Sequence, residues 1–374
     1  MADQFYRDTW AEINLDAIAY NIQQIKRKLP RYSDIMAVVK ANAYGHGAVD
    51  VAKEAISAGA GMLAVALLEE AEELRDAGIE VPILVFGRVS PRDVPIAVER
   101  DITLTFFQAD WLREVKQLQL SQPVSLHMKW DTGMGRVGLR TEEELLAILG
   151  ELEDQHAATL TGLYTHFATA DEADLSYFHM QYRRFEDLLK LFKRYWDQPV
   201  VIHTGNSAAS IRFPEEMQHY IRFGISLYGL YPSTVVKNER EIDLQPAFSL
   251  HTRLIHVKKI EAGESVSYGA TYTAEREEWI GTIPIGYADG WTRKLQGIDV
   301  LVDGKRMPTV GRVCMDQTMI RLDKEYPVGT KVTLIGKQVE EEIEADELAS
   351  WLDTINYEIP CMISARVPRI YTRR

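Results

Sequence analysis

Eight short apolar runs, with amphipathic segments between them, constrain the fold of this chain more than any other feature. The intervening segments have the 3.6-residue apolar period of helices, and strands that alternate with helices form parallel sheets. A count of eight favours a closed (β/α)8 barrel over an open doubly wound sheet, although periodicity alone leaves the open sheet as the alternative. The strand candidates are residues 34–40, 61–66, 82–87, 102–106, 124–130, 159–167, 199–205 and 219–225.

The helical segments carry their own start and stop signals. Thr141 and Glu144 have the spacing of a capping box at the start of a helix. Gly78 stands where a glycine commonly ends one. The predicted helical segments include residues 15–29, 69–78, 141–153 and 177–196.

A different pattern follows residue 240. Short alternating runs with tight-turn signals dominate there, and one of them, residues 264–274, places Tyr268 in a predicted strand. Val302-Asp303-Gly304-Lys305 predicts a β-hairpin. A chain of 374 residues is long enough for two domains. We therefore predict a (β/α)8 barrel over residues 1–240 and a mostly antiparallel β domain over residues 241–374. Residues 1–14 contain one more strand candidate, for which pairing with the second domain is the alternative.

Composition excludes several classes of protein. The chain has 55 acidic and 42 basic residues, and its net charge of −13 disfavours binding to nucleic acid or anionic lipid. No apolar run approaches the roughly 20 residues of a membrane span, and the N-terminus lacks a secretory signal pattern. The two cysteines have no metal-ligand spacing. We expect a cytoplasmic protein with no metal site and no nucleic-acid or membrane partner.

Polar side chains gather at the carboxyl ends of the predicted barrel strands, where the active sites of barrels lie. Each has a purely structural explanation when taken alone, but a shared rim favours an active site. Lys40 ends a buried strand, where desolvation favours the neutral amine that acts as a nucleophile. The set comprises Lys40, Lys129, Arg136, His166, Asn206, Ser207, Arg222, Gly224 and Ile225.

The segments after the last two predicted strands indicate a phosphate site. Barrels commonly bind phosphate there, through backbone N–H groups at the start of a short helix. The Ser207 hydroxyl and the N–H groups of Gly224 and Ile225 are candidate donors. A phosphate-bearing ligand beside a reactive lysine predicts either pyridoxal phosphate (PLP) or a sugar-phosphate aldolase that works through a Schiff base.

The motifs taken together resemble those of the alanine racemases, PLP-dependent enzymes built from a barrel and a β-rich domain. They follow the family's order over nearly the full length of the chain. The resemblance implies a homodimeric isomerase that interconverts L- and D-alanine and supplies D-alanine for peptidoglycan. The motifs are AVVKANAYGHG (37–47), KWDTGMGRVG (129–138), THFATAD (165–171), HTGNSAAS (203–210), RFGISLYG (222–229), SVSYGATY (265–272), IPIGYADGWTR (283–293), GRVCMDQ (311–317) and INYEIPC (355–361).

The resemblance also implies roles for single residues. Lys40 holds the cofactor and serves as the base on the D-side of the substrate, and Tyr268 of the partner subunit serves as the base on the L-side. His166 packs against the cofactor ring, and Arg136 and Met315 bind the substrate carboxylate. The phosphate is bound by Tyr44, Ser207, Gly224, Ile225 and Tyr357, with Asn206 beside it. The entrance or support residues are Lys129, which is carbamylated in some relatives, and Asp171, Tyr287, Arg293, Arg312 and Asp316.

Arg222 has a physical consequence of its own in this scheme. An arginine does not readily give up a proton, so the pyridine nitrogen that it faces stays unprotonated, which disfavours a long-lived carbanion and its side reactions. Decarboxylases of the same fold place an acidic residue there, so Arg222 counts against that function. The remaining alternatives are a serine or broad-specificity racemase and a PLP carrier without turnover. A carrier would resemble only the first half of the chain.

Overall fold

The computed structural model describes residues 6–153 and 156–373, which form two compact units. The barrel unit comprises Ala17–Ala43 and Ala48–Gln245, and the sheet unit comprises residues 6–16, Tyr44–Gly47 and residues 246–373. The sequence predicted a boundary after residue 240. The units divide five residues later, and the short segment Tyr44–Gly47 groups with the sheet unit. Residues 1–5, 154–155 and 374 of the two predicted domains lie outside the described residues.

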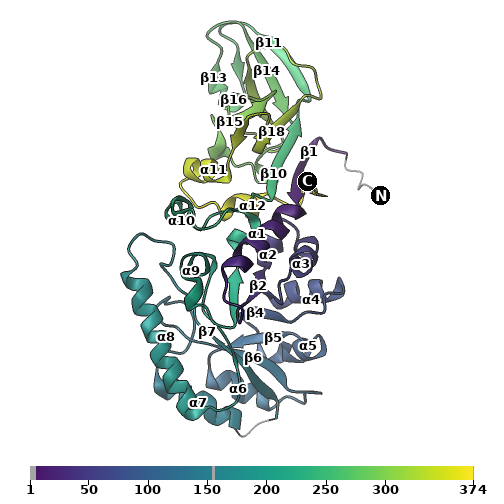
Figure 1. The fold of residues 1–374 in the computed structure, drawn as a ribbon. Coiled ribbons are helices and arrows are strands. Elements are labelled where there is room, and N and C mark those ends of the chain that lie inside the picture. The colour runs from purple at the N-terminus through teal and green to yellow at the C-terminus, as the bar shows by residue number, and fades with distance from the viewer. Residues whose placement is uncertain (1–5, 154–155, 374) are drawn as a thin grey trace. The chain divides into compact units, whose positions relative to one another are not determined.

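Eight parallel strands of the described barrel unit close into a barrel, with each strand paired to the next and the last to the first (Figure 1). All eight strand predictions are confirmed, and the closed order excludes the open sheet. The strands are nearly all buried, as expected for parallel strands with the core on one face and helices on the other. They are β2 (Asp34–Val38), β3 (Met62–Val65), β4 (Ile83–Arg88), β5 (Thr103–Phe106), β6 (Val124–Lys129), β7 (Ala158–Tyr164), β8 (Val201–His203) and β9 (Tyr220–Phe223).

Helices surround the barrel, and Figure 1 shows α5 to α8 on its outer side. Thr141 and Glu144 make the predicted capping box, because the Glu144 N–H donates to the Thr141 hydroxyl and the Thr141 N–H to the Glu144 carboxylate, both at 3.2 Å. Up to residue 245 the helical elements are α1 (Leu15–Lys28), α2 (Lys40–Tyr44), α3 (Ala48–Ser57), α4 (Leu68–Asp76), η1 (Pro91–Asp93), α5 (Val94–Glu99), α6 (Ala109–Lys116), α7 (Glu142–Glu153), α8 (Ser176–Tyr195), α9 (Ser207–Arg212), η2 (Pro214–Glu216), η3 (Ile225–Tyr228) and α10 (Thr234–Glu239).

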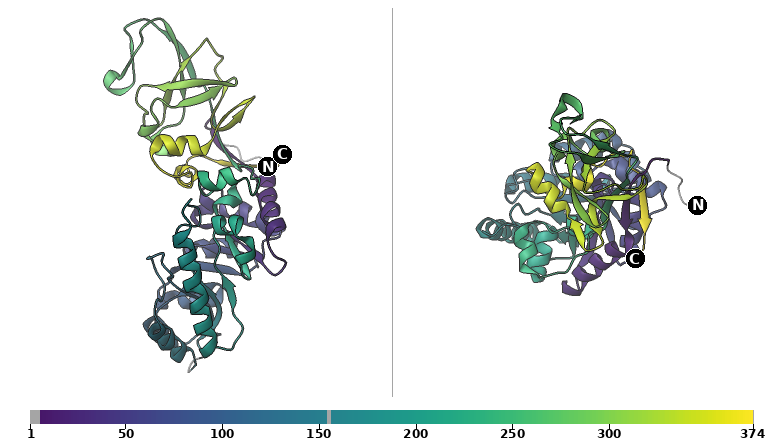
Figure 2. Two further views of the ribbon diagram at one scale, coloured as in Figure 1. Left: turned by 60° about the vertical axis from the view of Figure 1, so that its left-hand side comes forward. Right: turned by 90° about the horizontal axis from the view of Figure 1, so that it is seen from above.

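The described sheet unit is built around one mostly antiparallel sheet, drawn mainly in green to yellow in Figure 2. Its strand order is β11-β14-β17-β16-β15-β18-β10-β1-β20, with β19 paired to β18. The N-terminal strand β1 pairs antiparallel with β10 and parallel with β20. The strands are β1 (Thr9–Asn14), β10 (Phe248–Arg253), β11 (His256–Ile260), β14 (Glu278–Ile283), β15 (Asp299–Val302), β16 (Lys305–Val310), β17 (Thr318–Leu322), β18 (Lys331–Gln338), β19 (Glu341–Ile343) and β20 (Arg369–Thr372).

Local turn chemistry explains parts of this sheet. The hairpin predicted at residues 302–305 joins β15 to β16, and its central residues Asp303 and Gly304 have φ angles of 53° and 73°. A small core packs Ile260, Val266, Ala274, Ile280 and Val310 together. The other described elements of the unit are β12 (Ser265–Val266), β13 (Tyr272–Thr273), η4 (Tyr268–Ala270), η5 (Tyr287–Asp289), η6 (Arg293–Leu295), α11 (Ala345–Leu352) and α12 (Glu358–Met362).

One sequence interpretation in this unit was wrong. The alternating pattern placed Tyr268 within a strand, but the structure places it in η4, between the paired strands β12 and β13. Ser267 before it and Gly269 after it both have a positive φ, which ends the strand conformation. Among the residues that the structure describes, no helix is both long and apolar enough to cross a bilayer.

Candidate functional site

Charged side chains meet at the carboxyl end of the barrel, as the strand ends predicted. Lys129 is the last residue of β6, Arg222 lies in β9, and Lys40 lies two residues after the end of β2. His166 follows β7, and burial lowers its pKa, as do the charges of Arg222, Arg136, Lys129 and Lys40. The structure therefore brings these predicted residues to one end of the barrel, and their roles stay predictions. An excess of positive charge at one end of the barrel favours an anionic ligand.

The Arg222 guanidinium makes five hydrogen bonds at this end of the barrel. It is 4% exposed, and its Nη2 donates to the carbonyls of Thr165 at 2.7 Å and Thr204 at 2.9 Å. Arg222 Nη1 donates to the His203 carbonyl at 3.0 Å and to His203 Nδ1 at 2.9 Å. Arg222 Nη2 also donates to His166 Nδ1 at 3.1 Å. Burial lowers the pKa of Arg222 to about 10, so it keeps its charge at neutral pH. Every acceptor that these five bonds reach is neutral.

Lys129 has an unusual electrostatic environment. It is buried, and its Nζ lies 5.5 Å from the centre of the Tyr164 ring. Burial, followed by the charges of Arg136 and Arg222, lowers the pKa of Lys129 to about 8. Its amine is therefore partly neutral near neutral pH. Arg136 itself is exposed, in the loop after β6.

The residues predicted to bind phosphate in the barrel unit lie around the start of α9. Asn206 caps this helix by accepting a hydrogen bond from the Ala209 N–H at 3.0 Å. Ser207 is its first residue, and its buried hydroxyl accepts from the Gly224 N–H at 3.0 Å. Ile225 begins the neighbouring η3. A hydroxyl and the N–H groups of a helix start thus lie together, as anion binding requires.

The turn after Lys40 is strained. Ala41, Asn42, Ala43 and Tyr44 each have a φ of 52°, in the left-handed region that costs residues other than glycine about 1–2 kcal/mol apiece. Within the barrel unit, the Ala41 N–H donates to the Glu70 carboxylate at 2.5 Å and the Asn42 side chain accepts from the Ala48 N–H at 2.8 Å. These bonds offset part of the strain. Strain of this kind concentrates at functional sites, so it supports a role for Lys40.

The predicted residues of the sheet unit form two groups. Tyr44 and Tyr357 lie together, with ring centres 6.3 Å apart. Burial raises the pKa of Tyr44, so its hydroxyl remains a donor. In the second group Arg312 lies close to the turn that carries Tyr268, because a Cβ atom on Gly269 would come within 2.9 Å of Arg312 Nη1. Tyr268 itself is 71% exposed.

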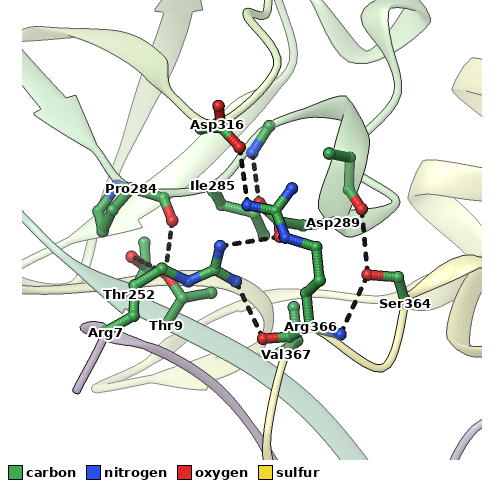
Figure 3. A network of polar contacts seen from close by, with 12 residues as sticks. Arg7, Thr9, Thr252, Pro284, Ile285, Asp289, Asp316, Ser364, Arg366 and Val367 are labelled. Carbon is green, nitrogen blue, oxygen red and sulfur yellow. Dashed lines mark hydrogen bonds and ion pairs between the residues drawn. The ribbon is translucent and has the colours of Figure 1, made fainter. Parts of the chain in front are cut away.

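A buried carboxylate organises another part of this unit (Figure 3). Asp289 is fully buried, and its Oδ1 accepts from Arg7 Nη1 at 2.8 Å and pairs with Arg366 Nε at 3.4 Å. Its Oδ2 accepts from the Gly286 N–H at 3.0 Å, which fixes the turn that carries Tyr287. Arg366 also forms an ion pair with the exposed Asp316, with Nη2 2.7 Å from Oδ1. This network ties the Tyr287 turn to the loop of Asp316, two of the predicted entrance residues.

The same loops are joined through their backbones. The Tyr287 N–H donates to the Cys314 carbonyl at 3.0 Å, and the Ala288 N–H donates to the Met315 carbonyl at 3.1 Å. Met315 is 53% exposed. Arg293 is exposed on η6 of the same unit, whereas Asp171 belongs to the barrel unit, where burial raises the pKa of its carboxyl.

Replacing Asp289 with asparagine is expected to destabilise the protein by about 1–3 kcal/mol, because two arginines lose their buried anionic partner. The change should appear as a lower urea midpoint of unfolding. The matched control is Asp316→Asn, which removes an exposed partner of the same Arg366 and should shift the midpoint little. Equal shifts for the two variants would contradict the importance of burial.

Two family models match successive parts of the chain. Residues 13–232 match the family described as alanine racemase, N-terminal domain, and residues 247–371 match alanine racemase, C-terminal domain. The chain belongs to the alanine racemase family. It is 56% identical over 372 residues to the alanine racemase of Geobacillus stearothermophilus, covering 99% of this chain and 95% of that one. Alanine racemase 1 of Bacillus subtilis is 51% identical over 98% of this chain and 94% of its own length.

Solved structures extend the similarity to the fold. An alanine racemase from Bacillus anthracis, solved with bound L-Ala-P, has a TM-score of 0.97 at 51% identity, covering 99% of this chain and 96% of that one. A histidine racemase from Leuconostoc mesenteroides has a TM-score of 0.92 at 32% identity, with full coverage of both chains. The family, the enzyme class and the fold predicted from the sequence are confirmed.

Three residues of the strand-end cluster had no predicted role. The Tyr164 ring stacks on His203 with centres 4.6 Å apart and planes at 12°. Burial raises the pKa of Tyr164 to about 12, and its hydroxyl lies 3.0 Å from that of Thr105. His203 Nε2 in turn lies 3.0 Å from His127 Nδ1. The sequence signal that could have indicated His127 was its spacing. His127 and Lys129 are two residues apart in β6, so both side chains lie on the same face of the strand.

Proposed function

We propose that this chain uses PLP to interconvert L-alanine and D-alanine. The observation that carries the proposal is the cationic group of Lys40, Lys129 and Arg222 at one end of the barrel, beside the helix start at Ser207. Such a set fits a ligand with a phosphate and a substrate with a carboxylate. The relatives at 51–56% identity that carry the name alanine racemase support the same substrate.

The residues present fit PLP. Lys40 would hold the cofactor through its amine, and the phosphate would lie at Ser207, Gly224 and Ile225, where a hydroxyl and backbone N–H groups converge. His166 would pack against the ring. The family pattern assigns the Tyr44 and Tyr357 hydroxyls to the same phosphate, and that assignment stays a prediction. When bound, PLP acts as an electron sink that makes the Cα proton of an amino acid easier to remove.

Arg222 would limit how strongly the cofactor ring withdraws electrons. Its guanidinium can only donate hydrogen bonds, so a ring nitrogen that meets it keeps its lone pair. The five neutral acceptors around Arg222 hold the group in place without neutralising its charge. Arg136 and the Met315 N–H are the proposed contacts of the substrate carboxylate. This arrangement favours removal and return of one proton over other outcomes.

Racemisation requires a base on each face of the substrate. We assign Lys40 to the D-side and Tyr268 of the partner subunit to the L-side, so the active form is a homodimer that shares its sites. The exposure of Tyr268 on its turn is compatible with a role in a partner's site. The entrance would be lined by Asp171, Tyr287, Arg293, Arg312 and Asp316.

Replacing Tyr268 with phenylalanine is expected to lower the rate from L-alanine by at least about a hundredfold, because the L-side base is lost. D-alanine should still exchange its Cα hydrogen for deuterium without inversion, since Lys40 serves that side. Mass spectrometry and chiral chromatography in deuterated water measure the two outcomes. Tyr272→Phe on the neighbouring β13 is the control and should retain both rates. Equal loss of exchange from both enantiomers would contradict the assignment.

We also propose that Lys129 is carbamylated. The neutral amine adds to CO2, forming an N–C bond and releasing one proton, and the product is an anion beside Arg136. With the pKa of Lys129 lowered to about 8, the neutral fraction grows as the pH rises through about 8. At a fixed CO2 pressure, the 13C NMR signal of the carbamate should therefore increase over that range. Lys129→Arg should lack the signal, and its presence in that variant would place the carbamate elsewhere.

Two alternatives are open to test. The histidine racemase similarity indicates that the fold serves other amino acids, so a serine or broader preference is the first alternative. A PLP carrier without turnover is the second, and it is disfavoured because both family domains are present. We further propose a cytoplasmic location and a supply of D-alanine to peptidoglycan.

The deciding experiment loads the purified protein with PLP and follows the optical rotation of L-alanine in deuterated water. Loss of rotation with deuterium at Cα supports the proposal. PLP binding without loss of rotation contradicts it, and parallel assays with L-serine and L-histidine then separate another racemase from a carrier. If PLP does not bind, the cofactor assignment is wrong.

A further inference from the structure

A line of two buried histidines extends from Arg222 into the barrel. Arg222 Nη1 lies 2.9 Å from His203 Nδ1, and His203 Nε2 lies 3.0 Å from His127 Nδ1. His203 is fully buried and His127 is 3% exposed. All three residues belong to the barrel unit. The family motifs include His203 without a role, and His127 precedes the motif that begins at Lys129.

The direction of these hydrogen bonds follows from the chemistry of arginine. A guanidinium has donors and no acceptor, so His203 Nδ1 must accept. A neutral imidazole has one proton, which His203 must therefore carry on Nε2 and donate to His127 Nδ1. His127 then carries its own proton on Nε2. Burial lowers the pKa of His127 to about 3 and holds that of His203 well below its ordinary value, so neither ring takes a second proton at neutral pH.

The barrel provides specific room for the second histidine. His127 in β6 pairs with Gly162 in β7, and a Cβ atom on Gly162 would lie 2.3 Å from His127 Cδ2. Any side chain at residue 162 would therefore displace the imidazole. The His203 ring is fixed independently, because it stacks on Tyr164. The pair is thus held in one geometry by its neighbours on both sides.

We propose that His127 is a positioning residue that acts through His203 on Arg222. By accepting the His203 Nε2 proton, His127 adds to the preference, already set by the guanidinium, for the tautomer whose Nδ1 lone pair faces Arg222. Without His127, the buried His203 Nε2–H loses its acceptor, the guanidinium alone favours this tautomer, and the share of the Nδ1–H form rises. Two donors would then face each other, and Arg222 would lose one of its five acceptors. The catalytic consequence depends on the proposed function, in which Arg222 faces the cofactor, but the tautomer does not.

The first test reads the tautomer directly in the full chain labelled with 15N-histidine and carrying no cofactor. We expect the two-bond 1H–15N spectrum to show His203 as neutral with its proton on Nε2. His127→Leu should shift His203 toward the Nδ1–H form. His127→Asn should restore the original pattern, because its Oδ1 can take the place of Nδ1 as acceptor. His256→Leu, at an exposed residue of β11, is the control for loss of a histidine and should leave the His203 signals unchanged.

The second test measures activity with PLP bound. Leaving a buried donor without its acceptor destabilises the arrangement that holds Arg222, so we expect alanine racemisation by His127→Leu to fall roughly tenfold, with most of it restored in His127→Asn. Gly162→Ala, which displaces the ring without removing it, should resemble His127→Leu in both tests.

The outcomes separate the two proposals. Wild-type His203 with its proton on Nδ1, or doubly protonated, overturns the inference without any variant. An unchanged His203 tautomer in a folded His127→Leu or Gly162→Ala protein overturns it as well. If the tautomer responds as expected but the wild-type protein does not racemise alanine, the proposed function fails and the positioning of Arg222 stands.

Discussion

Replacing Lys40 with alanine is expected to abolish racemisation in both directions, with a loss of at least about 10⁴-fold. The variant loses both the covalent attachment of the cofactor and the D-side base, because the same amine would serve both purposes. The groups around Ser207 that are proposed to bind the phosphate are untouched by the change. PLP should therefore still bind, but without a covalent link to the chain.

Borohydride reduction followed by peptide mapping checks this result. Reduction makes a link between an amine and the cofactor aldehyde permanent, so wild-type protein should yield a modified peptide that contains Lys40. The control is Lys40→Arg, which keeps the positive charge in the cationic group but lacks a nucleophilic amine. Both variants should give no modified peptide at residue 40. A modified peptide at Lys129 in wild-type protein would show that the wrong lysine had been assigned.

The gathering of chemistry at one end of the barrel followed from the sequence alone. Residues at the carboxyl ends of parallel strands share one rim whichever helices connect them. For that reason Lys40, Lys129 and Arg222 could be grouped before any coordinates. The same argument cannot specify which neighbours satisfy a buried charge. The five acceptors of Arg222 come mostly from backbone carbonyls, which leave no trace in a sequence.

The backbone conformation was harder to predict where it opposes the intrinsic preference of the residues. The left-handed turn at residues 41–44 occurs in residues that disfavour it, and it depends on bonds to Glu70 and Ala48 that lie outside the turn. Tyr268 was placed in a strand because its neighbours alternate, but positive φ angles at Ser267 and Gly269 end the strand there. His127 was read as part of an apolar strand. Only the pairing with Gly162 reveals the space that an imidazole needs.

Replacing Arg222 with glutamate is expected to lower alanine racemisation by at least about a hundredfold and to raise the share of transamination. Five acceptors that now meet a guanidinium would instead face a carboxylate, and breaking a buried charged network costs about 3–5 kcal/mol. Burial and the surrounding acceptors favour the protonated form of that carboxyl. A carboxylic acid can donate a proton to the ring nitrogen, which strengthens the electron sink and allows side reactions.

Product analysis tests this expectation independently of how much protein folds. The ratio of pyruvate formed to alanine racemised is measured within one sample, so partial unfolding lowers both quantities equally. Arg222→Lys is the matched control, since it keeps a positive charge with fewer donors and should lose rate without gaining pyruvate. If the glutamate and lysine variants have the same product ratio, the charge at residue 222 does not select the outcome of the reaction. Arg222 would then act only by holding His203, Thr165 and Thr204 in place.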